Sequence, residues 1–432
     1  MTSLALFRLG FNKSADRNPM TVYISVDYTC HEESWDPVIA TIQQQLDATD
    51  YGLRVHMEHG NIFHLGGFNL LEPAPENLQG FTHPVLELEY PYDDKIGMGA
   101  NIGAGRYVER SDNTMCNPLT GTFGCYVEVL VRGKWEKYAI TNYHVVRPAL
   151  DGFMYGFEET GGKRTTAYGE PKPGSDLRKA DEKGCKPNNR ACDLESPARA
   201  RHNWNVAKSR SLLRSSVQTH EGQNLRRQSS LAQKLAFFDE GKNKMGKLWA
   251  ASGIVVKDTA SGPKRLDWAL IDVEQSRQGH NLLPTGNLKT FFDTEVLPHH
   301  LGGRCLRNPE PNTTLASIVE GEQLYKIGTI TGATKGVFNE FKTCIRSDPS
   351  SYLPLPGEES QEYTIFGSFA KPGDSGSIVF KGSGEAVGLL WGGKGVHQTS
   401  EPFTFVTPLD DVFAHIKEVS GGVIEDVRIS EQ

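Results

Sequence analysis

Three short segments, far apart in the sequence, limit what this chain of 432 residues can fold into. They are TNYHVV at 141–146, DWAL at 267–270 and GDSG at 373–376. The first carries a histidine, the second an aspartate, and the third a serine between glycines. That order is one of those in which unrelated folds assemble a serine nucleophile, its base and an orienting acid. A fold that uses all three segments must bring distant parts of the chain together.

The residue types in these segments suit nucleophilic chemistry. A serine hydroxyl is a weak nucleophile at neutral pH, so Ser375 needs a neighbouring base, and imidazole is the side-chain base that works near neutral pH. We predict that His144 is this base and that Asp267 fixes its tautomer. Gly373 allows a turn in which its own N–H and that of Ser375 point into one pocket and hold a developing oxyanion. The predicted catalytic residues are therefore His144, Asp267 and Ser375, with Gly373 and Ser375 as the oxyanion hole.

Asp272 is a rival for the role of the acid. It lies five residues after Asp267 on the same predicted strand segment. Because side chains alternate along a strand, an odd spacing puts the two carboxylates on opposite faces, and only one of them can meet His144. The Asp-x-Ala-Leu context favours Asp267.

The three segments resemble the catalytic segments of the chymotrypsin-like (trypsin-like) serine proteases. TNYHVV is most similar to the intracellular HtrA-type and fungal trypsin-like branches, and the resemblance covers roughly residues 95–150 and 245–420. It implies two perpendicular β-barrels with the active site in the cleft between them. It also implies a serine endopeptidase (a hydrolase) that hydrolyses a protein or peptide substrate through an acyl-enzyme, without a metal or another cofactor.

The resemblance extends to substrate binding. Leu390, Trp391 and Gly392 resemble the edge strand that pairs with the substrate backbone, so substrate would bind as an added β-strand. Phe369 lies six residues before Ser375, where trypsin-like enzymes have an aspartate. We therefore expect a preference for a small or apolar side chain rather than for Lys or Arg.

Several departures from the family pattern bear on activation. Val145 follows His144 where secreted trypsins have a disulfide cysteine. Ser377 stands where the commonest form of the family pattern has a second glycine after the nucleophile. No Ile-Val-Gly-Gly cleavage site introduces the predicted barrel. Asp374 would then need a partner other than a freed N-terminus, and Lys371 is near in sequence.

Two other functions use the same segments. One is a degenerate protease fold that serves as a binding scaffold. The other keeps the acyl-enzyme but transfers the acyl group or ligates peptides instead of hydrolysing them. The intact set of three side chains argues against the scaffold, whereas hydrolysis and transfer have the same sequence signature.

The organisation of the chain is predicted to be mainly β, with a small α+β module at 1–92. That module has a strand at 21–28, a helix start at 34–37 and a further strand at 53–58, which makes a βαβ-like unit. Short strands bounded by glycine follow.

We assign 93–425 to a trypsin-like domain with a double β-barrel, interrupted by an insertion at 151–246 and closed by an amphipathic helix at 409–419. Part of the insertion, 211–234, is polar, basic and predicted to be helical. Such an insertion lies outside a minimal barrel.

The distribution of charge and of cysteines bears on which partners the protein binds and on whether its thiols are paired. Net charge is −7, but 183–234 has eleven Lys or Arg against three Asp or Glu. This basic insertion is a candidate site for an acidic partner; it carries no nucleic-acid motif, and a solvated loop is the simpler interpretation. The seven cysteines include no CxxC pair. Cys185 and Cys192 are either two unrelated thiols or a redox or metal pair, of which we favour the first.

The location of the protein in the cell is predicted from its apolar runs and its first twenty residues. No apolar run approaches the length of a membrane span, and residues 1–20 lack a secretory signal pattern. We therefore expect a cytoplasmic protein, with a mitochondrial or nuclear location as alternatives.

Overall fold

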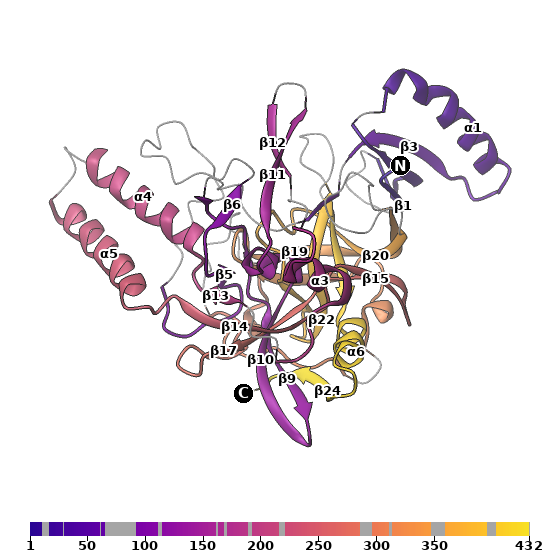
Figure 1. Ribbon diagram of the computed structural model, residues 1–432. Helices are drawn as coiled ribbons and strands as arrows, with labels where there is room; N and C mark the ends of the chain where they lie inside the picture. The colour runs from indigo at the N-terminus through magenta and orange to yellow at the C-terminus, as the bar shows by residue number, and fades with distance from the viewer. Residues whose placement is uncertain are drawn as a thin grey trace.

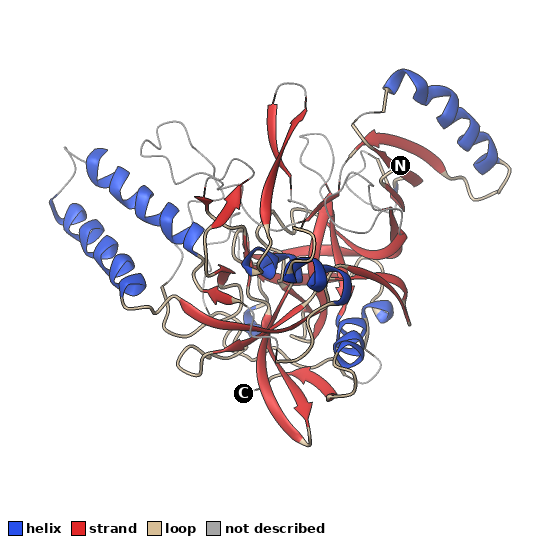
Figure 2. Ribbon diagram, viewed as in Figure 1, coloured by secondary structure: helices blue, strands red, loops and turns tan. Residues whose placement is uncertain are grey.

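β-Strands dominate the structure, a computed structural model, and form two large sheets and two small ones (Figure 2). The prediction of a mainly β fold is therefore confirmed. The structure describes residues 1–10, 17–28, 30–60, 62–64, 92–110, 115–160, 163–167, 171–188, 192–215, 221–285, 296–310, 313–346, 359–394 and 403–431.

One large sheet has eight strands in the order β24-β9-β10-β17-β14-β13-β5-β8. β9 (Cys125–Val131) and β10 (Lys134–Thr141) form a hairpin whose linking residues Arg132 and Gly133 have φ of 51° and 73°. Positive φ at both positions is typical of a type I′ turn, whose twist matches that of the paired strands. The other strands are β5 (Asn101–Ala104), β8 (Thr120–Thr122), β13 (Asp193–Glu195), β14 (Lys244–Ala251), β17 (Ala269–Val273) and β24 (Ile424–Ile429).

The other large sheet contains a closed ring of strands. Its order is β18-β21-β22-β23-β20-β19-β1-β2-β3, and β4 pairs with β22 off this path. β18 also pairs with β19, so the strands from β18 to β19 along this order close on themselves. The strands are β1 (Ser3–Arg8), β2 (Met20–Val26), β3 (Arg54–His59), β4 (Ile62–His64), β18 (Gln323–Gly328), β19 (Gly332–Arg346), β20 (Glu359–Phe366), β21 (Ile378–Lys381), β22 (Ala386–Lys394) and β23 (Phe403–Pro408).

The N-terminal segment has the predicted strand-helix-strand order. β2 and β3 are parallel, and α1 (Trp35–Asp47) connects them. β1 was not predicted; it pairs with β2 and also with β19, where Ser3 lies opposite Ile345. The sheet of the N-terminal segment thus continues into the ring, while the domain boundary at 92 stays a prediction. The unit projects at one side of the molecule, and no residue of α1 is buried (Figure 1).

The predicted insertion at 151–246 is partly sheet and partly helix. β13, inside it, pairs with β5 and β14, so the insertion is not wholly outside the sheet. The helical prediction for 211–234 is confirmed at 211–215 and 221–234 by α4 (Arg199–Ser215) and α5 (Glu221–Asp239), whereas 216–220 lie outside the described residues. α4 and α5 lie side by side, far from the N-terminal unit (Figure 1). The segment also has α3 (Asp176–Lys183), β11 (Met154–Thr160) and β12 (Lys163–Ala167).

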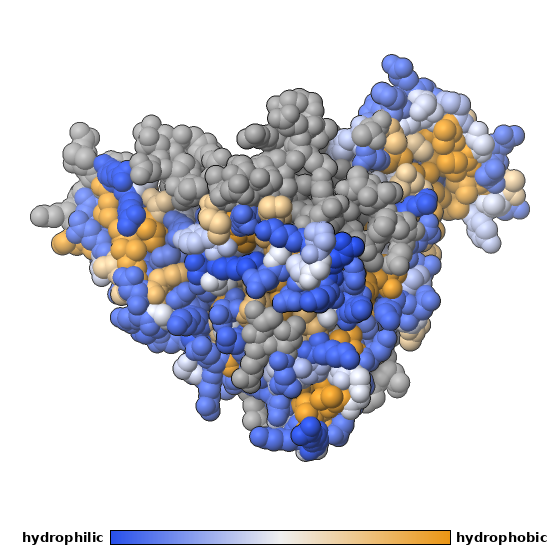
Figure 3. Space-filling model, viewed as in Figure 1, coloured by the Kyte–Doolittle hydropathy of each residue, from blue (hydrophilic) through white to orange (hydrophobic). Residues whose placement is uncertain are grey.

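The remaining elements are short, except for one helix. α6 (Leu409–Val419) has the predicted bounds, and β24 follows it. None of the described helices is long and apolar enough to cross a membrane. Hydrophilic side chains cover much of the face in Figure 3, and apolar ones gather on the N-terminal unit and on α4 and α5.

The short elements that remain are β6 (Val108–Arg110), β7 (Met115–Cys116), β15 (Val255–Thr259), β16 (Gly262–Leu266), α2 (Tyr143–Val146) and 3₁₀ turns at Glu32–Ser34, Arg147–Ala149, His299–Leu301 and Leu315–Ser317.

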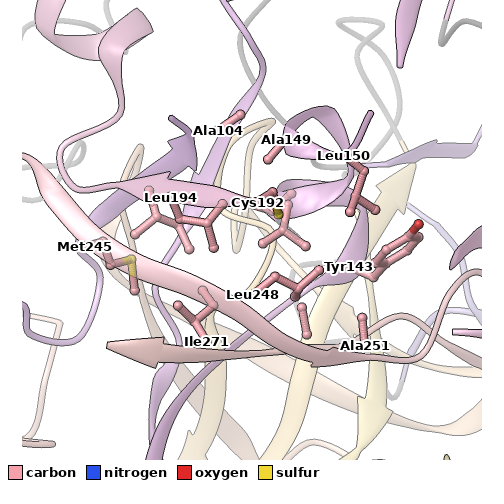
Figure 4. Packing of buried hydrophobic residues seen from close by; sticks show 14 of the residues in the cluster. Ala104, Tyr143, Ala149, Leu150, Cys192, Leu194, Met245, Leu248, Ala251 and Ile271 are labelled. Carbon is pink, nitrogen blue, oxygen red and sulfur yellow. The ribbon is translucent and has the colours of Figure 1, made fainter. Parts of the chain in front are cut away.

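A buried core fixes α2, the short helix that follows β10. Tyr143 lies in this core with Leu248 and Ala251 of β14, as Figure 4 shows. The Tyr143 hydroxyl donates to Oδ1 of Asp181 at 2.9 Å, and the Arg147 guanidinium binds the same buried carboxylate. Apolar packing and an ion pair therefore hold both ends of α2.

Candidate active site

Strand pairing brings His144 and Asp267 together. β10 runs antiparallel to β17, and Thr141 lies opposite Ala269 at the end of the ladder. His144 follows in α2, and Asp267 lies just before β17. Nδ1 of His144 is 2.6 Å from Oδ2 of Asp267, and the backbone N–H of His144 donates to Oδ1 at 3.0 Å. One carboxylate thus binds both the ring and the backbone of the histidine, which fixes the ring orientation.

The electrostatics of the pair keep Asp267 charged. Burial alone would raise its pKa, but His144 and then Arg265 outweigh burial, so the pKa of Asp267 lies below its usual value. Nη2 of Arg265 is 3.6 Å from Oδ2. A carboxylate at Nδ1 favours the tautomer with its proton on Nδ1, which makes Nε2 the basic nitrogen. This arrangement suits a general base with an orienting acid.

Arg265 is a site residue that sequence reasoning missed. Its guanidinium lies 4.6 Å from the centre of the Trp391 ring, and its backbone N–H donates to Glu362 at 2.8 Å. It therefore contacts both the acid and the strand of Trp391. The signal that could have found it is the two-residue spacing from Asp267, since residues i and i+2 share a face in extended chain.

The rival acid Asp272 lies on β17, opposite Lys247 of β14, and is half-buried. The carboxylate that contacts His144 is that of Asp267. The structure therefore brings the histidine to the acid that the Asp-x-Ala-Leu context favours.

Two successive tight turns present Ser375. The N–H of Asp374 donates to the carbonyl of Lys371 at 2.9 Å, and the N–H of Ser377 donates to the carbonyl of Asp374 at 3.1 Å. The third residues of these turns, Gly373 and Gly376, have φ of 103° and 94°. Positive φ at the third position is a property of type II turns and favours glycine. The glycines on both sides of the serine are thus explained by backbone conformation.

The turns leave two amides available. In the part of the chain that the structure describes, no acceptor is found for the backbone N–H of Gly373 or of Ser375. The N–H of Asp374 between them is used in the first turn. Two neighbouring unused donors are what an oxyanion hole requires.

β8 holds the serine turn and the histidine helix in one place. The N–H of Thr122 donates to the carbonyl of Ser375 at 2.8 Å, and its hydroxyl donates to the carbonyl of Gly373 at 2.9 Å. A Cβ built on Gly121 would lie 2.4 Å from Cγ2 of Val145, so α2 packs directly on this strand. Strand β8 therefore links the serine turn to the segment of His144.

The hydroxyl of Ser375 is directed to β22. It donates to the carbonyl of Trp391 at 3.2 Å, and Ser375 is 0% exposed. His144 is 1% exposed. The side chains of Ser375 and His144 are therefore shielded from solvent.

Lys326 of β18 is the partner of Asp374. Its Nζ lies 2.9 Å from Oδ2, and both side chains are 0% exposed. The N–H groups of Ile330 and Thr331 donate to Oδ1 at 2.9 and 3.2 Å. Burial lowers the pKa of Lys326, and the charge of Asp374 opposes that shift. The suggestion of Lys371 is corrected: its backbone N–H donates to Asp374 at 3.0 Å, but the ion pair is made by Lys326.

The predicted substrate-binding residues have different environments. Phe369 and Leu390 are fully buried in one apolar cluster, and the Trp391 ring lies in another with Phe7 and Phe405. The backbone of Leu390 bonds to the serine segment, because its carbonyl accepts from the N–H of residue 376 and its N–H donates to the carbonyl of residue 377, both at 3.0 Å. Pairing with another strand therefore begins after Leu390, and a specificity role of Phe369 stays a prediction.

A histidine behind the site makes stability depend on pH. Nε1 of Trp268 donates to Nδ1 of buried His415 at 3.0 Å, and burial lowers the pKa of His415 from 6.5 to about 4. Between these values the unfolded chain binds a proton that the folded chain does not. The contribution of His415 to stability is therefore full above pH 6.5 and is lost as the pH is lowered toward 4, by about 3 kcal/mol. His202, whose pKa burial also lowers to about 4, adds a loss of the same sign. Urea unfolding across this range measures the loss.

A His415→Gln variant should lose less stability over the same pH range, because it has no imidazole to protonate. The same change at exposed His299 is the control and should keep the wild-type dependence. Identical pH dependence in His415→Gln and wild type would show that His415 is not the group responsible.

Comparisons with known proteins give a coarse likeness. No protein-family model matches the chain, and no curated protein matches its sequence. Among solved structures, it is similar to a glutamic acid specific serine protease described as using a histidine triad in substrate binding, at 12% identity and TM-score 0.32, over 78% of this chain and 100% of that one. It is similar to Nocardiopsis protease NAPase at 12% and 0.34, over 78% and 98%. It is also similar to Cellulomonas bogoriensis chymotrypsin at 16% and 0.26, over 44% and 91%.

Proposed function

We propose that the chain is a chymotrypsin-like serine endopeptidase that hydrolyses peptide bonds through His144, Asp267 and Ser375. The observation that carries this proposal is that the carboxylate of Asp267 accepts two hydrogen bonds from His144, at 2.6 Å from the ring Nδ1 and at 3.0 Å from the backbone N–H. The shared strand β8, which contacts both the serine turn and α2, supports it. Assignment to the HtrA-type or fungal branch stays a prediction.

The proposed reaction begins when Ser375 exchanges its hydrogen bond to Trp391 for one to Nε2 of His144. Its oxygen then attacks the carbonyl carbon of the substrate, and its proton passes to His144. The backbone N–H groups of Gly373 and Ser375 bind the oxyanion, and Asp267 stabilises the imidazolium.

His144 next gives its proton to the amine as the C–N bond breaks, which leaves an ester on Ser375. Water, deprotonated by His144, attacks this ester and releases the carboxylic acid. The proton returns to the serine oxygen, and the enzyme is restored. An amine in place of the water would give acyl transfer, so the products separate hydrolysis from ligation.

The buried pair of Lys326 and Asp374 supports a site that is assembled without cleavage of the chain. In a fold of this kind the aspartate beside the nucleophile needs a cation to hold the oxyanion turn. Here an internal lysine is 2.9 Å away. We therefore infer that the turn has its active conformation in the intact chain.

The double-barrel architecture belongs to the same proposal. The ring of strands from β18 to β19 is the candidate for the barrel that carries Ser375. The eight-stranded sheet, with β10 and β17, is the candidate for the one that carries His144 and Asp267. A peptide would bind between them as a strand added to β22, and we expect neither metal nor cofactor in the reaction.

Active-site labelling tests the proposal. A fluorophosphonate probe should label the wild-type chain, and Ser375→Ala should abolish labelling because the attacking oxygen is gone. Ser383→Ala removes an exposed hydroxyl in the turn between β21 and β22 and should label like wild type. Continued labelling of a folded Ser375→Ala chain would show that another residue is the nucleophile.

A further inference from the structure

β22 has an edge that its neighbour β21 does not cover. The ladder between them pairs Ile378 with Leu389 and runs back to Ala386. On the other edge, β23 pairs with β22 as far as Lys394, opposite Phe403. Beyond Leu390, the edge on the β21 side is therefore open to another strand, and it begins beside the carbonyl of residue 391 that Ser375 contacts.

The chain fills this edge with its own strand. β4 pairs antiparallel with β22, with Ile62 opposite Lys394, Phe63 opposite Gly393 and His64 opposite Gly392. Since β23 occupies the other edge at the same residues, β4 lies on the edge that β21 leaves. Backbone pairing at an open edge is the means by which an extended peptide binds a sheet.

β4 runs along β22 in the same direction as the substrate residues that precede the bond to be cleaved. Because the pairing is antiparallel, the strand advances from Lys394 toward Gly392, and hence toward Trp391 and Ser375. The residues of a substrate that precede the bond to be cleaved must approach the nucleophile in this direction, with their carboxyl end leading. β4 therefore occupies the place that those residues need.

Side chains of β2 and β3 bind Lys394, the residue at the end of β22 that pairs with Ile62 of β4. This lysine is 4% exposed, and its Nζ donates to Ser25 at 2.5 Å and to Glu58 at 3.0 Å, as well as to the hydroxyl of Tyr23. A Cβ on Gly60 would lie 2.0 Å from Cε of Lys394, so the end of the lysine side chain packs directly on the backbone that follows β3. The end of β22 is thus bound by side chains of β2 and β3.

We propose that β4 is an internal competitor of peptide substrates, which holds the enzyme in an autoinhibited state until the strand leaves the β22 edge. This inference rests on the proposed protease function. The complete shielding of Ser375 and the 1% exposure of His144 agree with a covered site. The N-terminal unit is then a regulator that acts in cis, and a peptide substrate must displace β4 from the β22 edge before it reaches Ser375.

A proline in β4 tests the competition. Phe63→Pro in the full-length chain removes an amide and disfavours the extended pairing. It should raise kcat/KM on a mixed tetrapeptidyl-aminocoumarin library about tenfold or more, mainly by lowering KM, because the binding-competent fraction rises. Glu33→Pro, in the exposed first turn before α1, is the matched control and should stay within about twofold of wild type, since proline is tolerated there.

The outcomes separate the two proposals. If wild type and Phe63→Pro cleave the library equally and react equally with the fluorophosphonate, autoinhibition by β4 is overturned and the protease proposal stands. If no folded variant cleaves or labels, the protease function fails and the inference fails with it. If only Phe63→Pro gains activity, both are supported.

Hydrogen exchange supplies a measurement that does not depend on the proline variant folding. The full-length Ser375→Ala chain is mixed with a synthetic peptide of residues 56–64, with a scrambled peptide as control. The amides of residues 62–64 should lose protection as the added peptide displaces β4, while those of Gly392–Lys394 stay protected. Unchanged protection of 62–64 with the peptide bound would contradict the proposal.

Discussion

Asp267→Asn is expected to lower kcat about ten thousandfold while the fold is kept. The carboxylate accepts from both Nδ1 and the backbone N–H of His144, at 2.6 and 3.0 Å. An amide has one oxygen, so it can accept only one of these bonds well and presents an NH₂ group to the other. An NH₂ at the ring favours the tautomer with its proton on Nε2, which removes the base that the proposed mechanism assigns to Ser375. Peptide turnover by the purified variant measures the loss.

Asp272→Asn provides the matched control, since it makes the same change five residues along the chain. Asp272 lies opposite Lys247 on β14, so kcat should change by less than about fivefold. Thermal unfolding of both variants checks that the fold is kept. Loss of activity in Asp272→Asn with a fully active Asp267→Asn would assign the acid to the rival residue.

The elements that could be predicted from the sequence are those fixed by local patterns. The helix at 409–419 has apolar residues at helical spacing, and the structure gives the same bounds. The strand-helix-strand order near the N-terminus follows from the strand-forming residues at 21–28 and 53–58 and from the helix start at 34–37. The turn that carries Ser375 could be predicted as well, because the glycines at 373 and 376 are required by positive φ.

The features that could not be predicted depend on contacts between distant residues. Nearness in sequence points to Lys371 as a candidate partner of Asp374, whereas the fold places Lys326 of β18 there. β13 has only three residues and β4 likewise, too short for a periodic pattern. Which strand edge such a segment joins is decided by which edge is open, and that depends on the whole sheet.

Burial makes Lys326→Met a severe change. Asp374 would lose its cation while its carboxylate stays buried, and breaking a buried pair on one side costs about 3 to 5 kcal/mol of folding free energy. Asp374 also joins the two turns that aim the N–H groups of Gly373 and Ser375. If the carboxylate moves to find water, the proposed oxyanion hole is lost, and kcat should fall about a hundredfold to a thousandfold in the molecules that fold. Urea unfolding and peptide turnover measure the two losses.

Two further variants separate the ion pair from mere packing. Lys371→Met keeps the backbone N–H that donates to Asp374, so both its stability and its turnover should stay near wild type. Adding Asp374→Asn to Lys326→Met removes the stranded charge and should recover part of the stability, because a neutral pair does not carry the cost of an unpaired buried ion. Turnover should not recover in step, since the amide cannot reproduce all the bonds that the carboxylate accepts from the loop after β18. Equal destabilisation in the single and double variants would instead mean that the uncompensated charge of Asp374 is not the source of the loss, and the turn of Ser375 would then need another explanation for its rigidity.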